Sequence, residues 1–194
     1  NSAERVREAI SAGIKICGEN RVQELLEKDE LGAYEGAEKH FIGHLQRNKV
    51  KYVTGRCELI QSVGSNELIE LIAKRAALLG IRQNILLEVN IGREEAKSGF
   101  MPEMLDEAVG FAAEFKDINV QGLMAIPPNC ADKNESVYYF DSMYKLFVDI
   151  GAKKYDNVNM KIMSMGMSGD YVEAIRSGAN MVRVGSAIFG ERHY

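Results

Sequence analysis

The chain has 194 residues, 46% hydrophobic and 27% charged, which is typical of a globular domain with a sizeable core. A net charge of −4 argues against nucleic acid as a partner, and no apolar run approaches the roughly 20 residues of a membrane span. Three cysteines, Cys17, Cys57 and Cys130, fit neither a disulfide framework nor a zinc site. We therefore expect a reduced, cytoplasmic protein with a single domain over residues 1–194 and no metal.

Helical and strand patterns alternate along the whole chain, beginning with an amphipathic helix that ends near Gly13. Seven short strands are expected, in chain order at 14–17, 40–42, 59–63, 85–90, 120–126, 160–165 and 181–184. A helix is expected at 46–53, and Ser65 and Gly80 should cap the next one. Pro102 fits the first turn of another helix. Strands that are apolar on both faces are typical of a buried parallel sheet.

Repeated strand–helix units form either an open doubly wound sheet or a (β/α)8 TIM-type barrel. Polar and small residues follow many strands here, at 18–20, 43–44, 90, 124–126, 164–168 and 183–186. Loops that follow many strands meet at one mouth in a barrel, whereas an open sheet concentrates its site at one switch point. We therefore expect the barrel. Because the chain begins with a helix and offers seven strands, the first strand is expected to be missing, which would leave the domain N-terminally incomplete.

Two late segments, 164–170 and 181–190, each run from an apolar strand into small residues. Glycine lets the backbone approach an anion, and the start of a helix offers free amides. The pattern places Ser168 at the start of one helix and Gly185 and Ser186 at the start of the last, where barrels often bind phosphate. Either segment alone could be an ordinary turn with a helix cap. Together they indicate a phosphate site.

Arg183 alternates with two valines and therefore faces the opposite side of its strand. A charge within an apolar strand is costly unless it is paired or functional. A structural ion pair to a neighbouring strand is one explanation, and contact with a ligand is the other. The position beside Gly185 favours the ligand, because a phosphate site next to a fixed cation suits a phosphorylated ring cofactor.

Other candidates are single residues near strand ends. Asn20 is either a helix cap or a ligand contact, and His44 follows a strand more closely than His40, which begins one. Lys97 is a candidate catalytic amine, although most such loop charges are solvated. Met124 is either core filler or a contact for a flat ligand.

Taken in order, these segments resemble the pyridoxal phosphate homeostasis protein family, whose fold is similar to the N-terminal barrel of alanine racemases. The matching segments are 18–24 (GENRVQE), 40–49 (HFIGHLQRNK), 89–91, 97–99, 122–127 (GLMAIP), 164–168 (SMGMS) and 182–190 (VRVGSAIFG). They run nearly from end to end, so the ordered set is specific although each segment alone is weak.

The resemblance implies a bound pyridoxal 5′-phosphate (PLP). It implies that Arg183 faces the pyridine nitrogen, which stays unprotonated and makes the ring a weaker electron sink. The implied phosphate ligands are Ser168, Gly185 and Ser186, and the implied ring contacts are Asn20, His40 and Met124. The family's Schiff-base lysine is expected just upstream of Asn1, so no catalytic residue is assigned within this chain.

The resemblance also implies a function: a carrier or buffer of PLP with little or no catalysis, with PLP-dependent apoenzymes as recipients. A PLP-dependent amino-acid racemase is the alternative, but racemisation requires two opposed acid–base groups, for which Lys97 or His44 would have to serve. A barrel that binds another phosphorylated metabolite is the third hypothesis. We expect a monomer or a weak homodimer.

Overall fold

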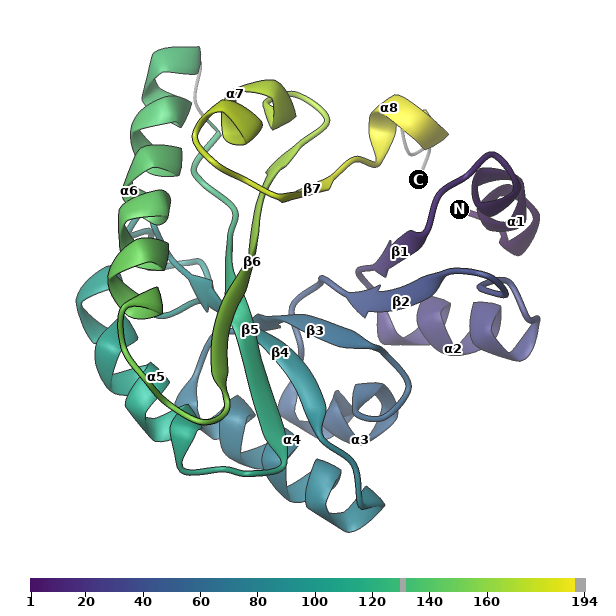
Figure 1. Cartoon of the computed structure of the whole chain (residues 1–194). Helices are drawn as coiled ribbons and strands as arrows, with labels where there is room; N and C mark the ends of the chain where they lie inside the picture. Colours follow the sequence, from purple (N-terminus) through teal and green to yellow (C-terminus); the bar gives the residue numbers. More distant parts are fainter. Residues whose placement is uncertain (130–131, 191–194) are drawn as a thin grey trace.

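Seven parallel strands form one sheet in the computed structural model, which describes residues 1–129 and 132–190 (Figure 1). The strands are β1 (Ile16–Glu19), β2 (Glu38–Phe41), β3 (Leu59–Val63), β4 (Gln83–Val89), β5 (Ile118–Ala125), β6 (Val158–Met167) and β7 (Met181–Arg183). Each strand pairs with the next one along the chain, whereas a doubly wound sheet contains a reversal of strand order. The TIM-type barrel is therefore confirmed, with seven of its strands in this chain.

Helices alternate with the strands and cover the outside of the sheet (Figure 1). They are α1 (Ala3–Ser11), α2 (Val22–Glu30), α3 (Val50–Val53), α4 (Asn66–Leu79), α5 (Leu105–Ala113), α6 (Lys133–Gly151), α7 (Tyr171–Arg176) and α8 (Ser186–Phe189), with 3-10 turns η1 (Arg47–Lys49) and η2 (Pro102–Met104). The caps of α4 are as predicted: the Ser65 hydroxyl accepts from the Leu68 amide, and Gly80 is left-handed at φ 65°. The single helix predicted at 46–53 is instead η1 followed by α3.

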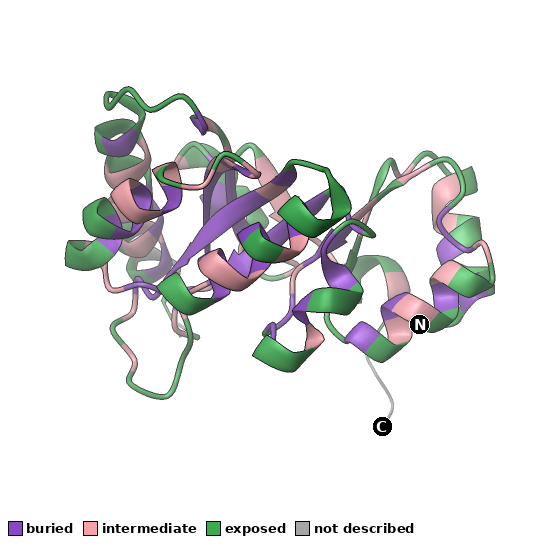
Figure 2. Ribbon diagram, turned by 90° about the horizontal axis from the view of Figure 1, so that it is seen from below, coloured by how far each residue is buried: buried purple, intermediate pink, exposed green. Residues whose placement is uncertain are grey.

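The core has two layers because side chains alternate across each strand. One face packs under the helices, as Ile60 and Leu87 do. The other face turns into the barrel, where Leu59, Leu86 and Met124 form a separate cluster. Figure 2 shows the central strands buried and the outward helix faces exposed. The inward layer fills the barrel, so a ligand site has to lie above it, at an end of the strands.

The sheet is open between β7 and β1, and α8 lies near α1 across this opening (Figure 1). Arg5 Nη2 on α1 donates to the Phe189 carbonyl at 2.5 Å, and its guanidinium lies 5.8 Å from the Phe189 ring centre. On the β1 side, the buried Lys28 and Glu19 form an ion pair at 2.6 Å. The first contact joins α1 to α8 across the opening, and the second joins α2 to the edge strand β1.

Cys17 and Cys57 are free thiols, and Cys130 lies outside the described residues. Burial raises the pKa of both thiols, that of Cys57 to about 12. Within residues 1–129 and 132–190, no group of His, Cys, Asp or Glu is arranged to hold a metal ion. None of the helices described there is long and apolar enough to cross a membrane.

Candidate functional site

The two late segments that the sequence singles out contact each other at the carboxyl ends of β6 and β7. Ser168 Oγ accepts hydrogen bonds from the amides of Gly185, at 3.1 Å, and Ala187, at 3.3 Å. A Cβ added to Gly185 would meet no atom within 4 Å, so this turn faces open space. An oxygen shared by two backbone amides occupies the position that an anion oxygen takes in phosphate sites. Ser186, the first residue of α8, is exposed beside them.

Ser168 does not begin a helix, contrary to the sequence prediction. The strand β6 extends to Met167, and α7 begins only at Tyr171 with Asp170 as its N-cap. The Asp170 carboxylate accepts from the Met167 amide at 2.6 Å and closes the turn between them. Because Asp170 makes this turn, the Ser168 hydroxyl is left to contact the start of α8.

Arg183 turns into the barrel and is held there by two hydrogen bonds. Its Nη1 donates to Ser164 Oγ at 2.6 Å, and its Nη2 donates to the Ala125 carbonyl at 2.8 Å. Both direct partners are neutral oxygens, and Glu88 and Asp170 act on the guanidinium by charge alone. Burial lowers the pKa of Arg183 to about 10, so the group remains charged at neutral pH. A fixed, charged donor therefore lies at the mouth of the barrel.

A chain of buried hydrogen bonds runs from Arg183 through Ser164 and Gln61 to His40. The Ser164 hydroxyl donates to Gln61 Oε1 at 2.7 Å, and Gln61 Nε2 donates to His40 Nδ1 at 3.0 Å. With Nδ1 accepting, the His40 proton lies on Nε2, which is 3.4 Å from Glu38 Oε2. Burial lowers the pKa of His40 and keeps the ring neutral. His40 is thus linked to the guanidinium through two intermediate side chains.

Glu88 is a buried acid at the same end of the barrel. Each of its carboxylate oxygens lies 3.1 Å from Ser98 Oγ. Burial raises the pKa of Glu88, while the Ser98 hydrogen bond and the charges of His44 and Arg183 oppose that rise. Lys97, a candidate amine to which the sequence assigns no catalytic role, forms an ion pair with Glu94 at 2.5 Å.

Sequence reasoning did not select Gln61 or Glu88 as site residues. Both were detectable, because each directly follows a run of apolar residues in its strand. Counting by twos from the inward-facing Leu59 and Leu86 places both inside the barrel.

The other two predicted ring contacts, Asn20 and Met124, lie at different depths in the barrel. Asn20 is exposed directly after β1 and is not the cap of α2, since Arg21 occupies that position. Its carbonyl packs against Gly43, where an added Cβ would lie 2.0 Å from that oxygen. Met124 is fully buried inside the barrel. Asn20 therefore lies at the mouth and Met124 among the interior side chains, and contact of either with a ligand stays a prediction.

Comparison with known sequences places the chain in one family. Residues 1–193 match the family model for the alanine racemase N-terminal domain. The pyridoxal phosphate homeostasis protein of Aquifex aeolicus is 44% identical over 98% of this chain and 83% of its own length. The Escherichia coli K12 protein of the same name is 36% identical over 99% of this chain and 82% of its own length.

Solved structures agree with this relationship. PipY of Synechococcus elongatus without PLP has a TM-score of 0.91 at 30% identity, over 98% of this chain and 88% of PipY. PipY with PLP bound has a TM-score of 0.88 at 29% identity, with the same coverage. An alanine racemase of Clostridium difficile, with a TM-score of 0.76 at 17% identity over 99% of this chain and 49% of its own, shares the fold. The chain therefore belongs to the pyridoxal phosphate homeostasis protein family, within the alanine racemase N-terminal domain family.

Proposed function

We propose that this chain binds PLP at the carboxyl ends of its strands and serves as a cytoplasmic carrier or buffer of that cofactor, with little or no catalysis. The observation that carries the proposal is the turn in which Ser168 Oγ is shared by the Gly185 and Ala187 amides, at the same end of the barrel as the fixed guanidinium of Arg183. The PLP-bound structure of the related PipY supports it.

The donors at this end of the barrel suit a phosphate-bearing heterocycle. Ser168, Gly185 and Ser186 would hold the phosphate, because amides and hydroxyls donate to anionic oxygens and the turn is open to solvent. Asn20 would line the ring pocket from the mouth, and His40 and Met124 from the barrel interior. We propose that residues 1–194 make up one PLP-binding domain.

Arg183 would face the ring nitrogen and favour binding over catalysis. When bound, PLP supplies a reactive aldehyde and a ring that withdraws electrons. A guanidinium with a pKa of about 10 stays charged at neutral pH and acts as a donor only, so it does not protonate the ring nitrogen as a carboxylic acid would. The ring is then a weak electron sink, which suits a carrier.

Ser164, Gln61 and His40 would act as positioning residues for Arg183. Ser164 accepts from the guanidinium and in turn donates to Gln61, so the hydroxyl has a fixed direction. Gln61 is held by His40 at its other end. An interior that orients its donor in this way loses little side-chain entropy when a ligand binds.

Titration with PLP, followed by absorbance and equilibrium dialysis, tests the proposal. We expect saturable binding of one equivalent that Arg183→Gln weakens. The loaded protein, incubated with single enantiomers of amino acids, should leave them unchanged. Racemisation at many turnovers would establish the enzyme alternative instead, and a failure to bind PLP would refute both.

We further propose PLP-dependent apoenzymes as recipients of the cofactor and a monomer or weak homodimer as the working state. Mixing the loaded protein with an apoenzyme should restore that enzyme's activity faster than protein-free dialysate does. Equal rates would argue against direct transfer. Sedimentation at several protein concentrations measures the oligomeric state.

A further inference from the structure

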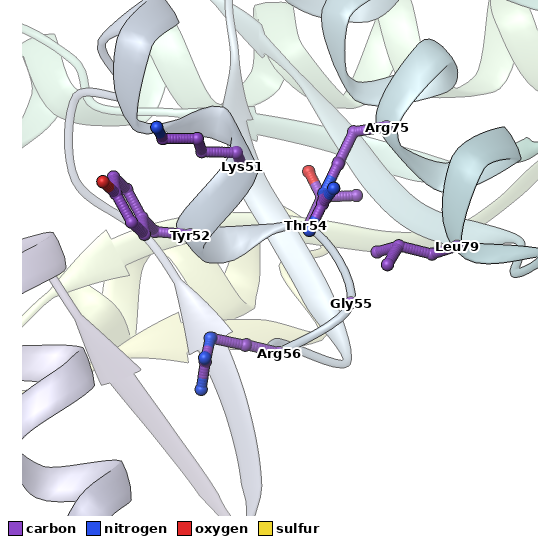
Figure 3. A pocket seen from close by; sticks show the side chains of 7 residues that line it. All are labelled: Lys51, Tyr52, Thr54, Gly55, Arg56, Arg75 and Leu79. Atoms are coloured by element: carbon purple, nitrogen blue, oxygen red, sulfur yellow. The ribbon is translucent and has the colours of Figure 1, made fainter.

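A cavity of about 600 Å³, seen from close by in Figure 3, lies where the strands begin. It is lined by Lys51, Tyr52, Thr54, Gly55, Arg56, Arg75 and Leu79, from α3, the loop after it and α4. Gly55 and Arg56 precede β3, whereas Ser168 and Gly185 follow β6 and β7. In a parallel barrel these positions are at opposite ends, so the cavity is separate from the proposed PLP site.

The charge of this cavity is positive. Three of its seven lining residues are cationic and none is acidic. Arg56 is partly neutralised by Asp29, which lies 3.2 Å away, and Lys51 lies 4.9 Å from the centre of the Tyr52 ring. The three cations lie around the cavity rather than pointing at one spot in it (Figure 3), and together they make its potential attractive to anions.

Two buried polar atoms in the cavity have no hydrogen-bond partner. Thr54 is 2% exposed, and neither its Oγ1 nor the Nε of Arg75 is hydrogen-bonded. The adjoining loop is otherwise satisfied, since the Gly55 amide donates to Gln83 Oε1 at 2.8 Å. Buried donors without acceptors are rare in folded proteins, so these two atoms require an explanation. Both can donate, but each has under 1 Å² of accessible surface, so an acceptor in the cavity reaches them only when the Arg75 side chain shifts.

We propose that this cavity binds a phosphate group, either inorganic phosphate or the phosphate of a small ester. The unprotonated oxygens of a phosphate accept hydrogen bonds, and they would take them from Thr54 Oγ1 and Arg75 Nε. Lys51 and Arg56 supply the remaining positive charge for a dianion. Tyr52 and Leu79 provide an apolar wall for the organic part of an ester. The site does not depend on the proposed PLP function.

Titration with inorganic phosphate at constant ionic strength, followed by amide chemical shifts, tests the site. We expect saturable shifts of the Gly55 and Arg56 amides, with an affinity that Arg75→Gln lowers at least tenfold. Lys74→Gln is the matched control, because Lys74 is the exposed neighbour on α4, paired with Glu70 at 2.5 Å, and loses the same charge. Equal weakening by both variants, or shifts that do not saturate, would overturn the proposal.

Phosphate that binds at the other end of the barrel is distinguished in the same spectra. It would shift the Gly185 and Ala187 amides, and Ser168→Ala rather than Arg75→Gln would change that response. Phenyl phosphate, titrated in the same way, tests whether the ligand is a phosphate ester. Tighter binding of phenyl phosphate than of inorganic phosphate, lost in Arg75→Gln, identifies an ester ligand, and equal binding with the same loss identifies free phosphate.

Thr54→Val supplies a test that does not depend on measuring affinity. The change replaces an unpartnered hydroxyl with a methyl group of similar shape, so the melting temperature without phosphate should rise. The increase that phosphate produces in wild-type protein should shrink at the same time. A variant with a lower melting temperature and an undiminished response to phosphate would contradict the role of Thr54.

Discussion

The two candidate sites, at opposite ends of the barrel, differ in whether their polar groups already have partners within the protein. At the carboxyl ends of the strands, donors find acceptors within the protein: Arg183 is held by Ser164, and the Gly185 amide by Ser168. At the amino ends, Thr54 Oγ1 and Arg75 Nε have no partner. A ligand at the carboxyl ends of the strands has to replace existing hydrogen bonds, although the donors there are already held in position. A ligand at the amino ends makes hydrogen bonds that the free protein lacks.

The barrel interior keeps the two ends apart. Leu59, Leu86 and Met124 form an apolar cluster, and the polar chain from His40 to Arg183 belongs to the carboxyl-end site. Changes at distant sites without shared partners add in free energy. Variants at one end should therefore leave ligand binding at the other end unchanged.

Arg183→Gln should have the largest effect on the carboxyl-end site. Loss of a charged donor weakens PLP binding by about 1.5–3 kcal/mol, which corresponds to roughly 10- to 100-fold in the dissociation constant. Arg176→Gln, at an exposed position on α7, is the matched control. Fluorescence titration measures both, and an unaltered affinity in Arg183→Gln would remove the guanidinium from the site.

Gln61→Leu tests whether the interior chain of hydrogen bonds acts as one unit. It leaves His40 Nδ1 without a donor and the Ser164 hydroxyl proton without an acceptor, which should lower the free energy of unfolding by about 2–3 kcal/mol. Urea unfolding measures the change, and Gln23→Leu on the exposed face of α2 is the control.

A double-mutant cycle with Ser164→Ala refines this test. Because Gln61 and Ser164 are in contact, their effects should be non-additive by about 0.5–3 kcal/mol. A positioning role also requires that Gln61→Leu weaken PLP binding. If the two effects are fully additive and the affinity for PLP is unchanged, these hydrogen bonds contribute to core packing only and do not position Arg183.

Ser168→Ala decides what the hydroxyl does when a ligand arrives. If it donates to the phosphate, its loss weakens PLP binding by about 1–2 kcal/mol, and this is the expected result. If the hydroxyl only occupies the place of an anion oxygen, its removal frees the Gly185 and Ala187 amides and strengthens binding. Equilibrium dialysis distinguishes the two signs.

The pH dependence of stability tests the environment of His40. Its pKa is lowered by burial, so below about pH 6.5 the unfolded chain takes up a proton that the folded protein does not. The free energy of unfolding should therefore fall as the pH drops from 7 toward 5, by at most about 1.4 kcal/mol per pH unit. His40→Gln should flatten this part of the profile, and an unchanged slope would show that another group is responsible.

Local patterns were enough to predict much of the fold. The caps Ser65 and Gly80 and the strand at 59–63 follow from short-range chemistry and periodicity, and the structure has them where the sequence predicts them. The barrel was predictable because polar segments follow many different strands. The turn near Ser168 was misassigned, because the Asp170 carboxylate, rather than the Ser168 hydroxyl, closes it.

Only the tertiary structure decided which polar side chains meet. Gln61 and Ser164 are 103 positions apart in the chain, and their hydrogen bond depends on how the strands are aligned around the barrel. The approach of Arg75 to Thr54 likewise depends on how α4 packs beside α3. Periodicity specifies the face on which a residue lies, because it is a property of one strand or helix. The partner across the barrel is set by strand register and helix packing, which involve distant segments together.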